Sequence, residues 1–423
     1  MGDAAVTPLT RVRRVGAVHR LLVTGVAAGF FLIAVASCEP GVESEERGVV
    51  VSDSAGVTLV ENPGPLAPDE VDPARRVRLD GPPLLRLGSE APAAPDFFGR
   101  VNTAHFDSRG DLWVVDAIAG ELRVFAVPSG EHRFTTGGRG DGPGEFQLPF
   151  PIGFDESTAW IWDQGHGRLT VLSLEGERME TRRVGEGLEL VPRLLHRRGD
   201  GTFLAHLPQT MSGPVSEGMI IDDTLRIWAF EEEPDEPRLL AERQGVTWYF
   251  TGRMQVPVPF AQGSRFALRD FRIVLTEPHG APEFDIIEDG RLTHRVRVAG
   301  DRVAVTAEAT QRELESPVRS EAAQEAVRAN LTALDLPDFI PTWEWVRIGR
   351  SGHIFALRYG GLTSDERWDV FDPEGVHLGL LELPPETHFA EADHRYLVLM
   401  EMPETRGPGI ALHEWPQAWS RRD

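Results

Sequence analysis

Five polar residues of this chain could do chemistry from the strands that we expect around them. Asp116 and Asp163 lie 47 residues apart, and each ends a short apolar strand. Asn102, His105 and His353 fall on or beside further expected strands. Carboxylate, amide and imidazole groups can bind a cation, transfer a proton or hold a polar ligand. We take these five residues as the candidate channel and ligand residues, and the sequence assigns no catalytic residue.

The same residues also have a structural interpretation. A buried aspartate at a strand end often accepts backbone N–H bonds across the following turn. A histidine on a strand is more often a satisfied polar group than a ligand, and no regular spacing links His105, His196, His353 and His388. The sequence therefore predicts no metal or cofactor, with a divalent ion such as calcium as the open alternative.

Composition excludes several classes of enzyme. The chain contains no lysine, so it has no phosphate-loop, Schiff-base or kinase-type lysine. Its single cysteine, Cys38, excludes internal disulfides and paired-cysteine metal sites. The net charge of -23 disfavours nucleic acid and anionic lipid as partners. Attachment to a membrane would therefore need a covalent anchor.

The N-terminal segment has the pattern of an export signal. Arginines precede a mostly apolar run over residues 21–36, and small residues lead up to Cys38. Residues 35–38 read Val-Ala-Ser-Cys and resemble the lipobox of bacterial lipoproteins. This resemblance implies cleavage before Cys38 and lipidation of its sulfur. We expect residues 1–37 to be a lipoprotein signal peptide and residues 38–56 a flexible acidic tether; a plain secretory signal and an uncleaved anchor are the alternatives.

The strands that must position these side chains occur in a repeat. The sequence from Leu84 aligns with the sequence from Arg133, and each copy has a glycine-bearing turn followed by three short strands. The first of these strands ends in Phe-Asp and the second in Asp. A period of about 47 residues with about four strands is typical of a β-propeller blade. Weaker copies continue to Trp415, and two β-sandwich domains are the alternative.

Residues 137–177 resemble an NHL-type repeat, with a glycine-rich loop, Pro-Gly-Glu-Phe, and an aromatic strand ending in Asp. The whole chain also resembles TolB-like propellers and a group of bacterial lipoprotein propellers of uncharacterised function. The resemblance implies an all-β fold, a six-bladed β-propeller over residues 57–416. It implies little about activity, because one propeller scaffold carries binding modules, lyases and lactonases.

The last blade has three strands of its own, and residues 84–88 are the candidate for its fourth. Pairing of these residues with residues 409–415 would close the ring and remove an open sheet edge. Residues 300–337 interrupt the strand pattern and predict a small helical insertion between blades 4 and 5. The insertion could pack on the propeller or cover one mouth of its channel. Residues 417–423 are expected to form a C-terminal tail.

These observations predict a lipid-anchored extracytoplasmic β-propeller that acts as a binding or scaffolding module at the cell envelope, on its periplasmic or surface face. Its partners would be the membrane, through the N-terminal lipid, and an envelope protein, a peptide or a glycan, but no nucleic acid. The alternative is a lactonase-like hydrolase or lyase with a carboxylate or metal site in the central channel.

Overall fold

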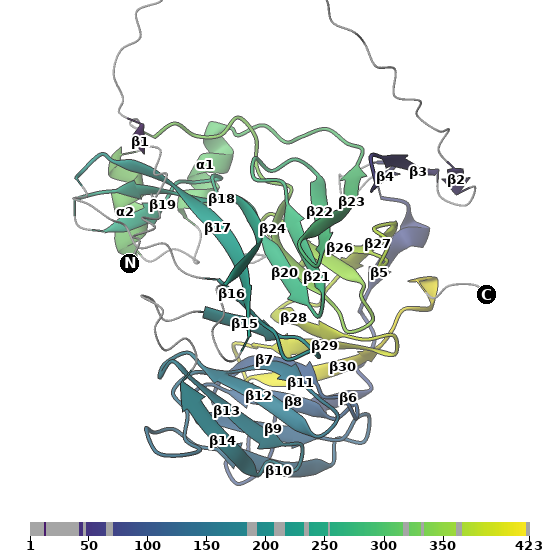
Figure 1. Cartoon of the computed structure of the whole chain (residues 1–423), viewed down its shortest axis with the longest axis vertical. Coiled ribbons are helices and arrows are strands. Elements are labelled where there is room, and N and C mark those ends of the chain that lie inside the picture. The colour runs from purple at the N-terminus through teal and green to yellow at the C-terminus, as the bar shows by residue number, and fades with distance from the viewer. Residues whose placement is uncertain are drawn as a thin grey trace, which may run out of the picture.

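The computed structural model describes most of the chain from Gly48 onward (Figure 1). Cys38 and nearly all of the expected signal peptide lie outside the described residues, so lipidation stays a prediction. No helix of the described part is long and apolar enough to cross a membrane. The described residues are 12–13, 42–44, 48–64, 71–183, 193–206, 216–231, 237–252, 254–315, 321–330, 334–360 and 366–419.

The described strands form six sheets, and the architecture is mostly β and consistent with a β-propeller. The first two sheets have four strands each, joined by short turns in which Gly120 and Gly167 occupy equivalent positions at positive φ. The first sheet contains β7 (Val101–Phe106), β8 (Leu112–Asp116), β9 (Glu121–Phe125) and β10 (His132–Gly137). The second contains β11 (Pro149–Phe154), β12 (Thr158–Asp163), β13 (Arg168–Ser173) and β14 (Arg178–Arg183).

The third sheet has two long strands that extend beyond the others. These strands are β17 (Ile220–Phe230) and β18 (Arg238–Phe250). The short N-terminal strand β1 (Val12–Arg13) pairs with β17, and β19 (Gln255–Pro257) pairs with β18. In chain order the sheet then contains β15 (Arg193–Arg197), β16 (Phe203–His206), β17 (Ile220–Phe230), β18 (Arg238–Phe250) and β19 (Gln255–Pro257).

The fourth sheet is widened by N-terminal strands. It contains β20 (Phe266–Arg269), β21 (Arg272–Thr276), β22 (Glu283–Glu288) and β23 (Arg291–Val298). On β23 lies β4 (Val57–Asn62) in parallel, followed by β3 (Val49–Ser54) and β2 (Val42–Ser44). The segment 38–56, expected to be a tether, thus includes paired strands. Val49 is 1% exposed and packs with Val60 in the core, which explains why this part of the segment is held on the sheet.

The fifth and sixth sheets also recruit N-terminal strands. The fifth contains β24 (Trp343–Ile348), β25 (Ile354–Arg358), β26 (Arg367–Phe371) and β27 (His377–Glu382), with β5 (Arg76–Arg78) parallel to β27 after the short helix η2 (Pro73–Arg75). The sixth contains β28 (Thr387–Ala392), β29 (Tyr396–Glu401), β30 (Gly409–Glu414) and β6 (Leu85–Leu87). Leu87 pairs with Ile410 and Leu85 with Leu412, so the predicted pairing of residues 84–88 with residues 409–415 is confirmed.

The first strand of each sheet, counted from β7 on, lies at the sheet edge and pairs with one other strand. We call these six strands, β7, β11, β15, β20, β24 and β28, the inner strands. Contacts join β28 to β7, β11 to β15, β15 to β20 and β20 to β24. Apolar clusters fill the space between neighbouring sheets; one joins Trp113 of the first sheet to Ile161 of the second. The inner strands therefore bring distant parts of the chain together.

Two helices, α1 (Ala307–Leu314) and α2 (Glu321–Asn330), lie between β23 and β24. The Thr306 hydroxyl accepts a 3.1 Å bond from the backbone N–H of Ala309 and caps α1. Leu314 and Val327 pack against Tyr249 in an apolar cluster, so the helices cover the extension of the third sheet. Figure 1 shows both helices beside β18 and β19, at the end of the molecule opposite β10 and β14.

The expected C-terminal tail begins with a short helix, η5 (Gln417–Trp419). Trp419 is 3% exposed, and its ring centroid lies 5.6 Å from that of Trp415. Both rings belong to the apolar cluster between the fifth and sixth sheets. The start of the tail is therefore part of the folded core.

Candidate functional site

Charged side chains from four inner strands meet in one cluster, which we call the channel cluster. Its centre consists of His105 on β7, Arg269 on β20, Arg347 on β24 and Glu391 on β28. Each of these side chains lies near the C-terminal end of its strand, and the strands bring them together because inner strands of neighbouring sheets lie side by side.

Glu391 holds the cluster together. Its side chain is 4% exposed; Oε2 lies 2.7 Å from Nη2 of Arg269 and 3.2 Å from Nδ1 of His105. Oε1 accepts a 3.0 Å bond from the backbone N–H of Ala392. Burial by itself would raise the pKa of Glu391, but Arg269 and His105 outweigh burial and lower this pKa to about 2. The carboxylate is therefore ionised throughout the neutral range.

The two arginines of the cluster differ in how well they are bonded. Arg269 donates from Nε to the carbonyl oxygen of Ile348 at 2.9 Å, in addition to its ion pair with Glu391. Arg347 makes a single long contact of 3.5 Å, from Nη1 to the carbonyl of Ala390, and its buried Nε has no hydrogen-bond partner in the described part of the chain. Burial lowers the pKa of Arg347, while Glu391 and Glu366 act in the opposite direction. Arg347 is therefore a cation with spare donor capacity.

A second carboxylate–imidazole pair lies next to Arg347. Oε1 of Glu366 lies 2.7 Å from Nδ1 of His388, an inner-strand residue of β28. The other oxygen of Glu366 accepts bonds from Trp368 Nε1 at 2.7 Å and from the backbone N–H of Phe389 at 3.1 Å. The bond to Glu366 raises the pKa of His388, whose side chain is 34% exposed. This pairing favours the protonated form of His388.

His196 of β15 lies close enough to Arg269 and His105 for their charges to affect it. Its Nε2 accepts a 2.9 Å bond from the backbone N–H of Asp270, which places the imidazole proton on Nδ1 in the neutral form. Burial lowers the pKa of His196, and the positive charge of Arg269 acts in the same direction. His196 is thus a neutral member beside cationic neighbours.

The predicted residues Asp116 and Asp163 bind backbone rather than the channel cluster. Asp116 accepts backbone N–H bonds of 2.8 to 3.2 Å from Gly99, Arg100, Ile118 and Ala119. Asp163 accepts equivalent bonds from Gln147, Leu148 and Gly165, and a 2.5 Å bond from His166. These contacts fit the structural interpretation, in which each aspartate ties the loop before its sheet to the turn after β8 or β12.

Of the remaining predicted residues, His105 belongs to the channel cluster, and Asn102 and His353 lie elsewhere. His105 is in the channel cluster, and Thr103 Oγ1 on the same strand lies 2.9 Å from its Nε2. Asn102 is the extra residue of a β-bulge on β7, two positions after the loop that Asp116 holds. His353 lies in the turn before β25, 2.8 Å from Ser351 Oγ and with its ring 4.6 Å from that of Trp415. His353 therefore packs against an aromatic ring outside the cluster.

Sequence reasoning missed the arginines and glutamates of the channel cluster. Arg269, Arg347 and Glu391 lie on strands that are otherwise mostly apolar, where a charge needs a partner. That local contrast is the signal that could have found them. No group of three or more His, Cys, Asp or Glu side chains in the described ranges is arranged to hold a metal ion.

No protein-family model and no curated protein sequence matches this chain. Among solved structures, a Bacteroides fragilis protein described as exported is 10% identical, with a TM-score of 0.46 over 78% of this chain and 94% of its own. Regucalcin, a calcium-binding protein of Agrobacterium tumefaciens, is 13% identical, with a TM-score of 0.37 over 80% and 95%. Virginiamycin B lyase of Staphylococcus aureus is 12% identical, with a TM-score of 0.36 over 89% and 93%. The six described sheets and their strand pairings are by themselves consistent with a β-propeller.

Proposed function

We propose that this chain is an exported, lipid-anchored β-propeller that binds a ligand at the cell envelope. In this proposal the six sheets are six blades around one channel, residues 300–337 are inserted between blades 4 and 5, and Cys38 carries the lipid. The pairing of β6 with β30 supports a closed ring, because it joins segments from the two ends of the propeller. The apolar segment before Cys38 supports export. Kinship with NHL-type and TolB-like propellers belongs to the same proposal.

The ligand presents an acidic group to the channel cluster, such as a carboxylate of an envelope peptide or glycan. Arg347 is the observation that carries this step, because its guanidinium has one long contact and a buried Nε without a partner among the described residues. Guanidinium groups form paired, charge-assisted bonds with carboxylates. A ligand carboxylate would satisfy these N–H groups, and the partly exposed His105 and His388 would flank it.

One observation favours an enzyme as the second candidate. Glu366 raises the pKa of His388 and holds its ring, as expected of a histidine that donates and accepts protons. Beside Arg347, this pair suits a lyase or hydrolase that acts on an acidic substrate. If the protein converts the ligands that it binds into products, it is an enzyme; if the ligands stay intact, it is a binding module.

The test uses purified chain and two families of probes. Calorimetry compares the binding of short peptides that have a free C-terminal carboxylate with that of the same peptides as C-terminal amides. It also compares uronic acid oligosaccharides with neutral oligosaccharides. Arg347→Gln removes the cation, and Arg291→Gln, on the exposed β23 position, is the matched control. We expect binding of an acidic family, weakened at least ~10-fold by Arg347→Gln and unchanged by Arg291→Gln. The assignment of the ligand site to the channel cluster would be refuted if acidic and neutral probes bind equally well. It would also be refuted if the two variants bind the acidic probes equally well.

A further inference from the structure

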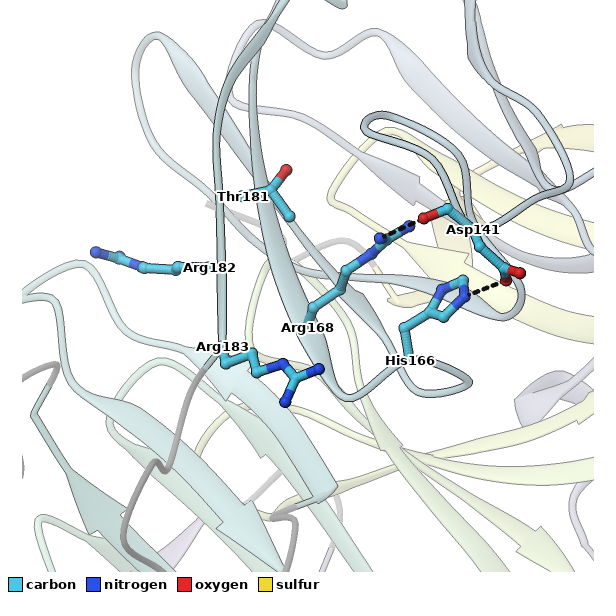
Figure 2. A pocket seen from close by; sticks show the side chains of 6 residues that line it. All are labelled: Asp141, His166, Arg168, Thr181, Arg182 and Arg183. Atoms are coloured by element: carbon cyan, nitrogen blue, oxygen red, sulfur yellow. Dashed lines mark hydrogen bonds and ion pairs between the residues drawn. The ribbon is translucent and has the colours of Figure 1, made fainter.

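A pocket of about 360 Å³ lies on the second sheet, at the outer strand β14 and the turn between β12 and β13. It does not contain any inner-strand residue and is separate from the channel cluster. Figure 2 shows its lining, which consists of Asp141, His166, Arg168, Thr181, Arg182 and Arg183. Four of these six side chains are basic, although the chain as a whole has a net charge of -23. A basic hollow on an acidic protein calls for a specific explanation.

His166 is fixed between two carboxylates. Its Nδ1 lies 2.5 Å from the buried Oδ2 of Asp163, and its Nε2 lies 2.7 Å from Oδ1 of Asp141. The bonds to Asp163 and Asp141 raise the pKa of His166, and the bond to His166 lowers the pKa of Asp141. Both ring nitrogens of His166 are occupied by these carboxylates, so a ligand in the pocket would meet the charge of the arginines rather than that of the imidazole.

Arg168 gives the pocket a rigid wall. Its guanidinium donates to the carbonyl oxygens of Asp141 and Gly142 at 3.1 Å each, and also to that of Glu145. These three acceptors are neutral, and the buried Oδ2 of Asp163 lies 3.8 Å from Nε, so Arg168 shares this carboxylate with His166. The side chain of Glu145 bonds to the backbone N–H of Gly142 and stabilises the loop that supplies the carbonyls. The loop and Arg168 therefore form one preorganised unit.

Arg183 is the cation that a ligand can reach. It is exposed at the end of β14, and none of the described carboxylates lies within 4.0 Å of its guanidinium. Figure 2 shows the Arg183 side chain extending toward Arg168 and His166, whereas Arg182 points away from them. Charged residues on an edge strand commonly prevent sheet-to-sheet pairing. That role does not explain why Arg183 turns into a hollow beside two further cations.

We infer that this pocket binds a tetrahedral oxyanion, a phosphate or sulfate ester carried by a sugar. Arg168 at the start of β13 and Arg183 at the end of β14 face the pocket from two strands, so their guanidinium groups can approach an anion from different directions. Convergent donors suit a tetrahedral anion, whereas a planar carboxylate is matched by a single guanidinium fork. The volume accommodates one sugar-sized group, and the hydroxyl of Thr181 adds a further donor to its lining.

The experiment measures binding of glucose 6-phosphate, glucose 6-sulfate and glucose to the chain by calorimetry at constant ionic strength, with acetate as a planar anion. Arg183→Ala removes the accessible cation, and Arg178→Ala, on the same strand outside the lining, is the matched control. Circular dichroism spectra of both variants establish that they fold. We expect one or both esters to bind, with a loss of at least ~10-fold in Arg183→Ala and less than about 2-fold in Arg178→Ala.

The pattern of binding identifies the source of the anion. A preference for the phosphate ester assigns the pocket to phosphorylated glycans, and a preference for the sulfate ester assigns it to sulfated glycans. Binding of neither ester overturns the proposal. Equal binding of acetate, or equal loss in Arg183→Ala and Arg178→Ala, also overturns it, because either result reduces the pocket to nonspecific surface charge.

Discussion

Replacing Glu391 by glutamine tests whether the channel cluster stabilises the fold as well as shaping a binding site. The substitution keeps the size of the side chain but removes the charge that lies 2.7 Å from Arg269 and 3.2 Å from His105. It also points an amide, which can donate, at groups that donate themselves. Glu366 would then be the carboxylate that remains near Arg347, and Arg269 would lose its ion pair with Glu391.

The size of the effect follows from the pKa of Glu391. A drop from the ordinary 4.5 to about 2 corresponds to about 3 kcal/mol of stability at neutral pH. The side chain is 4% exposed, so solvent screening reduces this value little. Removing one partner of a buried ion pair costs about 3–5 kcal/mol in other proteins, which agrees with this figure.

The pH dependence has a defined sign. Because the pKa of Glu391 is lower in the folded chain than in the unfolded chain, its contribution is complete above about pH 4.5 and is lost as the pH falls toward about 2. At about pH 3 roughly half of it remains. The free-energy difference between the wild type and Glu391→Gln should therefore shrink by about half between pH 7 and pH 3.

The assay is urea unfolding followed by tryptophan fluorescence at both pH values. Glu90→Gln, at an exposed position that pairs with none of the described basic side chains, is the control and should differ from the wild type by less than about 0.5 kcal/mol. A loss of less than about 1 kcal/mol in Glu391→Gln at pH 7 would show that the cluster is held by other contacts. A gap between wild type and variant that stays constant down to pH 3 would refute the electrostatic origin.

Two further predictions concern the sheet framework. Asp116→Asn should lower the free energy of unfolding by about 2 kcal/mol, because its amide N–H₂ would face some of the four backbone N–H groups that donate to Asp116. Asp301→Asn, on an exposed residue, is the control. Equal melting temperatures of the two variants would contradict the expectation. Trp419→Ala should cost about 3 kcal/mol in urea unfolding because the ring is 3% exposed, whereas Trp345→Ala, at 46% exposure, should cost less than about 1 kcal/mol. Similar losses in both tryptophan variants would mean that Trp419 is not part of the core.

The closing strand could be predicted from the sequence, because the cue is local. Residues 84–88 have the composition of a short outer strand before a repeat, and the last repeat has three strands of its own. The structure pairs Leu85–Leu87 with β30, as the repeat requires. The strand-end aspartates Asp116 and Asp163 were found for the same reason, since they occupy equivalent places in two neighbouring copies.

The N-terminal additions could not be predicted from such local cues. β4 pairs in parallel with β23, and β5 in parallel with β27, over more than two hundred residues of intervening chain. A parallel pairing of this kind leaves no turn signal, because the turn residues that mark a hairpin are absent. Valines such as Val49 were assigned to a tether for that reason, although they have an apolar partner in the fold.

The channel cluster was hidden by bulges in the inner strands. Five of the six, all except β20, have a register shift against their neighbour. A bulge inserts one residue and reverses the alternation of side chains beyond it. On β28 the extra residue is Ala390, and it brings His388 and Glu391, three positions apart, to the same charged cluster beside Arg347. A strict period of two would place these side chains on opposite faces, so the site follows from the bulges rather than from the alternation in the sequence.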